Sequence, residues 1–362
     1  MDFFKTPAEM LSKLFLKGYQ WPFDVRKVAG GSSIIDVLVY LERCKGRRVY
    51  LDYRRNPVGG AFSYDELEPE ARDYLTRAGA CFGTPVERLG HMNAPAVEFY
   101  RDKGVDLARE PLEISLCAQH NNGGLAIDCW WQTNVAGLFA VGEASASHGV
   151  YRPGGTALNA GQVGSTRAAQ YIAAKRGGAP EEGFEQAAAQ ALEQMGALAR
   201  RALQPQGNVR ALWAQAARRM SECGAAIRDG GAIAVYLAEV KAQLASFERN
   251  VTASELRWVY RLRDMLISQY AYLAAMLDYM QQGGKSRGSA LYTDPAGKKP
   301  YAQLPDAFTF VLDDGSRGGR VQEMLYRDGA CVFEWRPVRP IPKDDDFFEN
   351  VWREYRETGN VG

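Results

Sequence analysis

The sequence has few histidines and cysteines, the side chains that hold zinc and iron–sulfur clusters. Its 362 residues include only three histidines and six cysteines, and no two cysteines form a C-x-x-C pair. Zinc and iron–sulfur sites need closely spaced ligands of these types, so we expect no metal site. Isolated cysteines in a chain of this size are typical of buried thiols in a reducing compartment, and we expect a cytoplasmic protein.

The chain also lacks a large excess of one charge and a long apolar run. Lys and Arg number 44 against 43 Asp and Glu, which leaves no broad positive field for nucleic acid or an anionic membrane. No apolar run approaches the roughly 20 residues that span a bilayer. The first ten residues lack the basic and apolar regions of a secretory signal. We therefore expect neither a nucleic-acid nor a membrane partner.

A dinucleotide-binding fingerprint is missing as well. The chain holds 37 glycines but not one Gly-x-Gly, which excludes the G-x-G-x-x-G turn that cradles the pyrophosphate of a dinucleotide. Between His120 and Arg176, however, glycine pairs, two histidines, a carboxylate and an arginine lie among apolar runs. The functional interpretation depends on this part of the chain.

Residues 1–115 combine helix signals with two short strand patterns. Thr6 and Ser33 stand where helix caps are expected, each followed three residues later by an acidic residue. Val49–Tyr53 reads as a strand, and the alternation from Leu112 to Leu116 predicts another. We expect a small α+β unit over this range.

The second half of the chain has a different pattern. Residues 178–298 carry apolar side chains at helical spacing in successive stripes, which predicts a helical bundle. Residues 299–362 contain two short apolar runs, Phe308–Leu312 and Ala330–Trp335, which suggest a hairpin in a small β or irregular extension. Nothing on the helical stripes indicates catalysis.

Residues 116–177 carry the pattern of a ligand site. Leu138–Val141 lies between glycines and reads as a buried parallel strand, with Glu143 at its carboxyl end, where open α/β sheets bind ligands. A carboxylate there suits a ribose hydroxyl. Gly154–Leu158 then begins a helix that ends near Lys175 and whose first N–H groups and positive dipole end favour an electron-rich ligand edge.

The order of these motifs resembles the C-terminal flavin-contacting segment of the fumarate reductase/succinate dehydrogenase flavoprotein family, which includes L-aspartate oxidase. That family shows a His before a Gly-Gly turn, a Thr-x-x-x-Gly-Leu-aromatic-Ala-x-Gly-Glu block, a His-Gly-x-x-Arg motif and a glycine-rich start to the last helix. The matching residues here are His120, Gly123-Gly124, Thr133, Gly137 to Glu143, His148 to Arg152 and Gly154 to Leu158. The likeness is strong over 118–172, extends to Arg48–Arg54 and Ser286–Gly288, and is sketchy after 180.

The resemblance implies an FAD-dependent oxidoreductase that moves a hydride between flavin and a small, carboxylate-bearing substrate. His120 and Arg152 would grip the substrate carboxylate, for which arginine offers a bidentate fork. His148 would add a hydrogen bond or support the loop. The implied FAD-binding residues are Gly142, Glu143, Gly154, Gly155, Thr156, Ala157 and Leu158.

The implied fold class is α/β, a partial FAD-binding fold with an α+β capping segment, followed by a C-terminal α-helical bundle. The expected domains are the C-terminal part of a capping domain (1–115), the C-terminal segment of the FAD-binding domain (116–177), the helical bundle (178–298) and the small extension (299–362).

Two departures from the family leave questions open. The G-x-G-x-x-G half of the FAD site is absent, so we expect it on a separate chain or a missing N-terminal region, and we expect an inactive chain without it. Ser32-Ser33 stands where fumarate reductases carry an Arg-Asp pair that delivers the proton, with Arg26 nearby. The alternative to an enzyme is a non-catalytic, truncated or split-gene partner subunit that retains the fold. A plain helical interaction module would leave the central motif unexplained.

Overall fold

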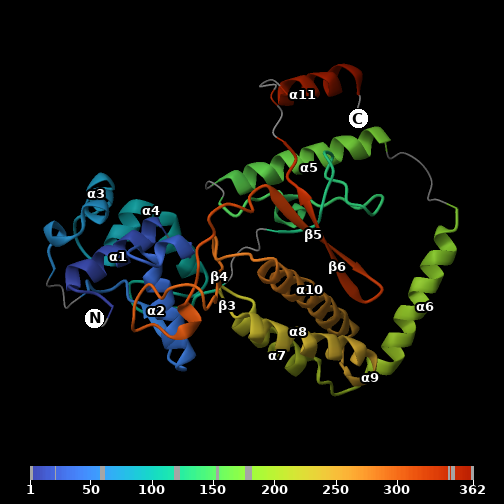
Figure 1. Ribbon diagram of the computed structural model, residues 1–362, viewed down its shortest axis with the longest axis horizontal. Coiled ribbons are helices and arrows are strands. Elements are labelled where there is room, and N and C mark those ends of the chain that lie inside the picture. The colour runs from blue at the N-terminus through green and yellow to red at the C-terminus, as the bar shows by residue number, and fades with distance from the viewer. Residues whose placement is uncertain are drawn as a thin grey trace. The chain divides into compact units, whose positions relative to one another are not determined.

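A computed structural model describes residues 3–20, 22–57, 62–117, 123–151, 155–175, 182–340, 343 and 347–359 (Figure 1). The chain divides into two compact units. The first comprises Met1–Ala118, Ala225–Asp229 and Lys285–Asp313, and the second comprises Gln119–Gly224, Gly230–Gly284 and Asp314–Gly362. Within the described residues the chain is a mixed structure of helices and small two-stranded sheets.

The first unit begins with the helix predicted from the Thr6 cap. The cap predicted at Ser33 is wrong, because Ser33 is the first residue of its helix and the preceding Ser32 forms no capping hydrogen bond. The Thr6 hydroxyl accepts a hydrogen bond from the Glu9 N–H (3.1 Å) at the start of α1, and Thr84 and Glu87 form a capping box at the start of α4. The predicted strands pair as an antiparallel ladder, Val49 opposite Ile114. The elements are α1 (Pro7–Tyr19), α2 (Ser33–Cys44), β1 (Val49–Leu51), α3 (Pro69–Arg77), α4 (Pro85–Asp102) and β2 (Leu112–Ile114).

Segments from far along the chain complete this unit. Strand β3 (Ile227–Arg228) pairs in parallel with β4 (Leu291–Tyr292). Ile227, Leu291 and Phe308 are buried in the same apolar cluster as Val28 and Ile34. Contacts between residues so distant in sequence leave no local sequence pattern from which they could be predicted. The domain boundaries predicted at 115, 177 and 298 remain predictions.

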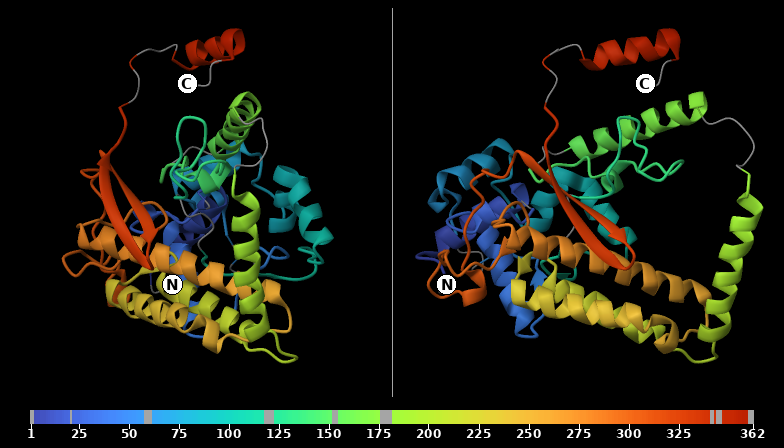
Figure 2. Two further views of the ribbon diagram at one scale, coloured as in Figure 1. Left: turned by 90° about the vertical axis from the view of Figure 1, so that its right-hand side faces the viewer. Right: turned by 45° about the vertical axis from the view of Figure 1, so that its right-hand side comes forward.

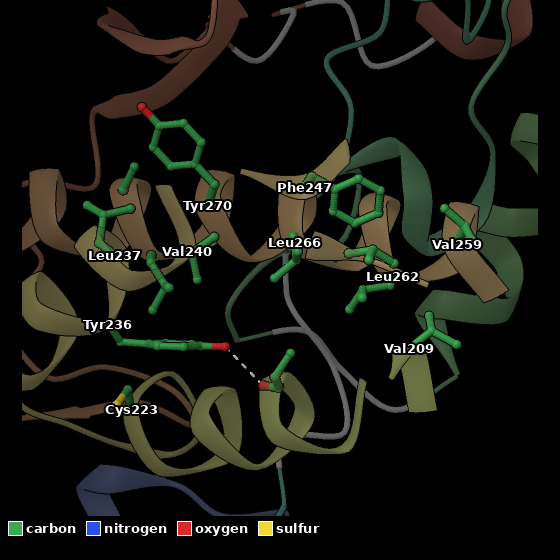
Figure 3. Close-up of a cluster of buried hydrophobic side chains, with 14 of the residues drawn as sticks. Val209, Cys223, Tyr236, Leu237, Val240, Phe247, Val259, Leu262, Leu266 and Tyr270 are labelled. Carbon is green, nitrogen blue, oxygen red and sulfur yellow. Dashed lines mark hydrogen bonds between the residues drawn. The ribbon is translucent and has the colours of Figure 1, made fainter. Parts of the chain in front are cut away.

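In the second unit, the helices predicted from apolar periodicity pack around one core. We call residues 184–281 the helical region. It consists of α6 (Phe184–Ala202), α7 (Val209–Cys223), α8 (Gly230–Ala245), the short α9 (Phe247–Asn250) and α10 (Leu256–Gln281). Figure 2 shows α8 and α10 side by side, and Figure 3 shows the buried side chains that they share. The Tyr236 hydroxyl donates to the Ala216 carbonyl (3.0 Å) within this core.

A hairpin packs on α10. Strands β5 (Arg320–Arg327) and β6 (Ala330–Pro337) are antiparallel, and Gln322 and Trp335 both donate to Oδ2 of Asp278 (2.7 and 2.8 Å). The prediction of a strand at 330–335 is confirmed. Its expected partner at Phe308–Leu312 is wrong, because Phe308 is buried in the core of the first unit and ends a 3₁₀ helix there.

The remaining described α-helices are α5 (Thr156–Lys175) and α11 (Phe347–Thr358), both in the second unit. In the portion of the chain that the structure covers, no helix is long and apolar enough to cross a membrane. The prediction of buried cysteine thiols is wrong for four of the six, because Cys44, Cys81, Cys117 and Cys129 are exposed.

Candidate functional site

The residues predicted to form the site fall partly inside and partly outside the described structure. His120, Arg152 and Gly154 lie outside the described residues. The structure describes the other seven in the second unit: Gly142, Glu143, His148, Gly155, Thr156, Ala157 and Leu158. We call residues 123–175, as far as they are described, the central segment.

The predicted glycine turn at 123–124 allows two loops to lie in contact. The Leu125 N–H donates to the Ala144 carbonyl (2.7 Å). A Cβ atom at Gly124 would come within 2.5 Å of the same carbonyl oxygen, a distance that side chains do not tolerate. Gly124 does not have a positive φ, so glycine is required here for close approach to residues 144–146 and not for the left-handed backbone of a turn.

The buried parallel strand expected at Leu138–Val141 is not formed. This run is the returning arm of a tight loop, in which Thr133 N–H donates to the Leu138 carbonyl (2.8 Å) and Ala140 N–H donates to the Trp131 carbonyl (3.0 Å). Among the described residues no strand lies beside it, so Leu138 and Val141 remain 48% and 36% exposed. The prediction failed because an apolar run reports a tendency to be buried and does not report which chain covers it.

Gly142 and Glu143 open a short 3₁₀ helix at Gly142–Ser145. Gly142 has a φ of 64°, in the left-handed region that favours glycine. The Ser145 hydroxyl donates to the Gly142 carbonyl (2.7 Å) and closes the turn. Glu143 is exposed on this turn, where its carboxylate can face a ligand.

Helix α5 packs against this turn and begins in an exposed position. Gly155 has a φ of 81° directly before the first helical residue, Thr156. A Cβ atom at Gly161 would lie 3.7 Å from the Cα atom of Gly142, so the first turns of α5 adjoin the 142–145 turn. Leu158 projects outward and is 78% exposed. An apolar side chain thus lies at a helix N-terminus, an arrangement that can contact the plane of an aromatic ring.

The inner face of α5 holds the loop in place through residues that the sequence analysis did not select. A methyl group at Gly164 would overlap the indole nitrogen of Trp131, which lies directly against the helix. The Arg167 guanidinium stacks over Trp130 (4.3 Å to the ring centroid) and donates from Nε to the Cys129 carbonyl (3.1 Å). A signal of close packing could have identified this face from the sequence. It is the spacing by three and four of the small residues Gly161, Gly164 and Ala168.

His148 is buried, with 8% of its surface exposed. It lies in the loop between the 142–145 turn and α5. Both roles considered from the sequence, a hydrogen bond to substrate or support of the loop, stay predictions.

Ser32 and Ser33, which the resemblance predicts at the place of the family's Arg-Asp pair, are fully buried in the first unit. The Ser32 hydroxyl donates to Oε1 of Gln20 (3.0 Å), and the Ser33 hydroxyl accepts from the Asp24 N–H (3.0 Å). Arg26 forms an ion pair with Asp24 (2.7 Å) and is half-exposed. The serines are therefore engaged in packing around the start of α2.

The described residues of the central segment fit the ring end of a flavin. They supply an exposed helix N-terminus, an exposed carboxylate and an apolar side chain, and two glycines with positive φ keep the backbone accessible. No cluster of His, Cys, Asp or Glu that could hold a metal ion occurs in the part of the chain that the structure describes.

Comparison with known proteins was consistent with this geometry. A family model described as an FAD binding domain matches residues 39–158. A fumarate reductase (CoM/CoB) subunit from Methanothermobacter marburgensis is 47% identical over 70 residues, which are 19% of this chain and 13% of that protein. L-aspartate oxidase from Mycobacterium leprae is 40% identical over 76 residues, 20% of this chain and 14% of that protein.

Among solved structures, a quinol-fumarate reductase determined with menaquinol molecules has a similar fold. The TM-score is 0.53 at 20% sequence identity, and the similarity covers 83% of this chain and 57% of that chain. This chain therefore spans little more than half the length of the structure that it resembles.

Proposed function

Because the chain belongs to the fumarate reductase/succinate dehydrogenase flavoprotein family, whose cofactor is FAD, we propose that its central segment is the ring-facing half of the FAD site of an oxidoreductase. The observation that carries this proposal is the exposed start of α5 beside the Gly142–Ser145 turn. The isoalloxazine ring accepts and returns a hydride when FAD is bound. The residues of this chain bind and orient that ring and the substrate.

In the proposed site, each described residue has a distinct role. The Glu143 carboxylate accepts hydrogen bonds from ribose hydroxyls, for which its exposed position is suited. The first N–H groups of α5 face the electron-rich edge of the ring, and the helix dipole favours negative charge there. Leu158 contacts the ring plane and excludes water from it.

The substrate is proposed to be a small carboxylate held by His120 and Arg152. Arginine binds a carboxylate through two parallel N–H···O bonds, which fixes both the position and the angle of the substrate. His148 adds a hydrogen bond or orients the loop that bears Arg152.

The other half of the site is proposed to come from a dinucleotide-binding region with a G-x-G-x-x-G turn, on a separate chain or elsewhere in the protein. Two observations support this: the chain has no Gly-x-Gly, and Leu138, Val141 and Leu158 are exposed where a neighbouring layer would cover them. Covering apolar surface stabilises such an assembly by roughly 25 cal/mol per Å².

Titration with FAD tests the proposal. We expect the chain alone to leave the flavin absorbance band unchanged, and we expect the band to shift once a G-x-G-x-x-G half from a homologous protein is added. If the reconstituted complex forms but contains no flavin, the proposal is wrong. If flavin binds but no carboxylate substrate is turned over, the non-catalytic partner subunit becomes the correct description.

Arg152→Ala tests the substrate assignment in the flavin-loaded complex. Loss of a charge-assisted fork removes about 1.5–3 kcal/mol, so turnover should fall about 10- to 100-fold while the flavin stays bound. Arg152→Lys keeps the positive charge but cannot form the two parallel hydrogen bonds, so its turnover should lie between that of the unchanged protein and that of Arg152→Ala. Unchanged turnover in Arg152→Ala would exclude Arg152 from the substrate site.

A further inference from the structure

At one end of the helical region, three arginines surround a single tryptophan. The guanidinium carbons of Arg210, Arg261 and Arg257 lie 3.5, 5.0 and 6.0 Å from the ring centroid of Trp258. Trp213 meets the same ring edge-on at 5.8 Å. We call these five residues the arginine–tryptophan patch. None of them is used by the FAD site proposed above.

The positive charge of the patch is only partly neutralised. Arg257 forms an ion pair with Glu255 (2.7 Å). Within the described ranges, neither Arg210 nor Arg261 has an ion pair or a hydrogen bond to a carboxylate, and both side chains are exposed. An arginine that lies over an aromatic ring keeps its N–H donors, and these can bind a carboxylate in two parallel hydrogen bonds.

The positions of these arginines are unfavourable for the chain by itself. Arg210 and Arg257 are each the second residue of their helix. Neither α7 nor α10 has an acidic residue in its first turn, and among the described residues the one carboxylate that forms an ion pair with either arginine is Glu255, which directly precedes α10 and pairs with Arg257. A cation at a helix N-terminus opposes the helix dipole. Figure 3 places Val209 and Val259, from the starts of α7 and α10, at the same end of the core, so the two positive ends adjoin. An anionic partner would relieve this arrangement.

The backbone beneath the patch is fixed by hydrogen bonds between the two loops that precede these helices. Val209 N–H donates to the Thr252 carbonyl (3.0 Å), and the Asn208 amide donates to the Asn250 carbonyl (2.7 Å). A Cβ atom at Gly207 would come within 2.5 Å of Thr252 O, so only glycine permits this approach. A surface held in place before binding loses little entropy when a partner docks.

We propose that the arginine–tryptophan patch is a docking surface for an acidic segment of a partner protein. Arginine and tryptophan are the residue types that dominate the energetics of protein interfaces, and rim charges set the rate and the salt dependence of association. The side chains lie on the outer surface of two helices and stack on aromatic rings, which suits a protein surface. With 44 basic against 43 acidic residues, the chain has no broad positive field to hold a nucleic acid.

The test measures binding of a fluorescein-labelled peptide of about eight glutamates to the full chain by anisotropy, at about 20 mM and about 200 mM salt. We expect binding at low salt that weakens as salt rises. The Arg210→Glu/Arg261→Glu variant should bind at least roughly tenfold more weakly. Glutamate suits a helix N-terminus, so α7 should fold normally in this variant.

Arg200→Glu/Arg218→Glu is the matched control, because it makes the same change in net charge at exposed positions outside the patch. We expect its affinity to change by less than about threefold, because isolated exposed charges contribute little to binding. The proposal is refuted if the control variant loses as much affinity for the peptide as the patch variant does. It is also refuted if the unchanged chain does not bind the peptide. Inorganic tripolyphosphate could also displace the labelled peptide. If it does so at a far lower concentration of negative charge than unlabelled glutamate peptide needs, the patch is a phosphate site and the proposal of a protein-docking surface is wrong.

Discussion

The helical region and the central segment both carry apolar side chains, but the helical region buries them in an extended core, whereas the central segment leaves several large ones exposed. Leu262, Leu266 and Leu273 are no more than 1% exposed in the core that α7, α8 and α10 share. In the central segment, Leu138 and Leu158 are 48% and 78% exposed. A complete core and an open apolar surface thus occur within one unit of the chain.

The difference shows what each region needs in order to be stable. Antiparallel helices with matching stripes cover one another, so most of the apolar surface of the helical region is buried among its own helices, with Cys331 and Phe333 of the hairpin packed against the same core. The central segment has glycine turns and an apolar run that find no second layer among the described residues. This contrast supports the proposal that another surface, together with FAD, completes the central segment.

Removing a buried leucine from the helical region should have the largest effect. Leu266→Ala should lower the free energy of unfolding by about 2–5 kcal/mol, because the cavity cannot collapse in a packed core. Urea unfolding followed by circular dichroism measures this. Leu192→Ala, at a position that is 66% exposed in α6, is the matched control and should change stability by less than about 0.5 kcal/mol. Similar losses in both variants would mean that the helical region lacks a specific core.

Tyr236→Phe should have the next largest effect. The Tyr236 hydroxyl donates within a buried network in which Oε1 of Gln269 lies 2.7 Å away, and its loss leaves a buried oxygen unsatisfied at a cost of about 1–3 kcal/mol. Burial raises the pKa of Tyr236 to about 12.

A pH series sharpens the same prediction. Because the folded state holds the Tyr236 proton more tightly than the unfolded chain, whose tyrosine pKa is about 10, this stabilisation is complete below pH 10 and is lost as the pH rises toward 12. Comparison of unfolding at successive pH values in the two proteins should show a steeper loss with Tyr236 than with Phe. Parallel curves would contradict the assignment.

A smaller effect is expected in the central segment, where Gly164→Ala would place a methyl group against the Trp131 indole. The shifts that relieve this overlap should lower the free energy of unfolding by about 1–3 kcal/mol, and the better helix propensity of alanine offsets part of this loss. The wavelength of tryptophan emission should also change. Gly161→Ala is the control, since its Cβ atom would lie at an ordinary 3.7 Å from Gly142. Gly161→Ala should leave the free energy of unfolding unchanged or raise it by up to about 1 kcal/mol. Equal effects of the two changes would mean that α5 does not pack on the loop through Gly164.

The smallest effect on stability is expected for Leu158→Ser. Since Leu158 is 78% exposed, unfolding of the chain alone should change by less than about 0.5 kcal/mol. In the reconstituted complex, however, the same change should weaken FAD binding, as measured by flavin fluorescence titration. A large loss of stability in the isolated chain would show that Leu158 is already covered.

The local features of the fold could be predicted from the sequence because they depend on neighbouring residues. The Thr6 cap of α1, the β1–β2 strands and the apolar stripes of α7, α8 and α10 follow from spacing alone. The site could be predicted only in part. The resemblance selected the glycines at 142 and 155, which have positive φ, but the packing of Gly164 and Arg167 against the tryptophan pair involves residues more than thirty positions apart.

The sequence by itself determined the family resemblance, the glycine turns and the helical stripes, since each is a pattern within a short stretch of chain. Tertiary structure decided where residues 225–229 and 285–313 belong, that Phe308 lies in the core of the first unit, and that Leu138–Val141 has no neighbouring strand among the described residues. The physical reason is that burial depends on which distant segment covers a surface, and an apolar run has the same sequence whether it is covered or open.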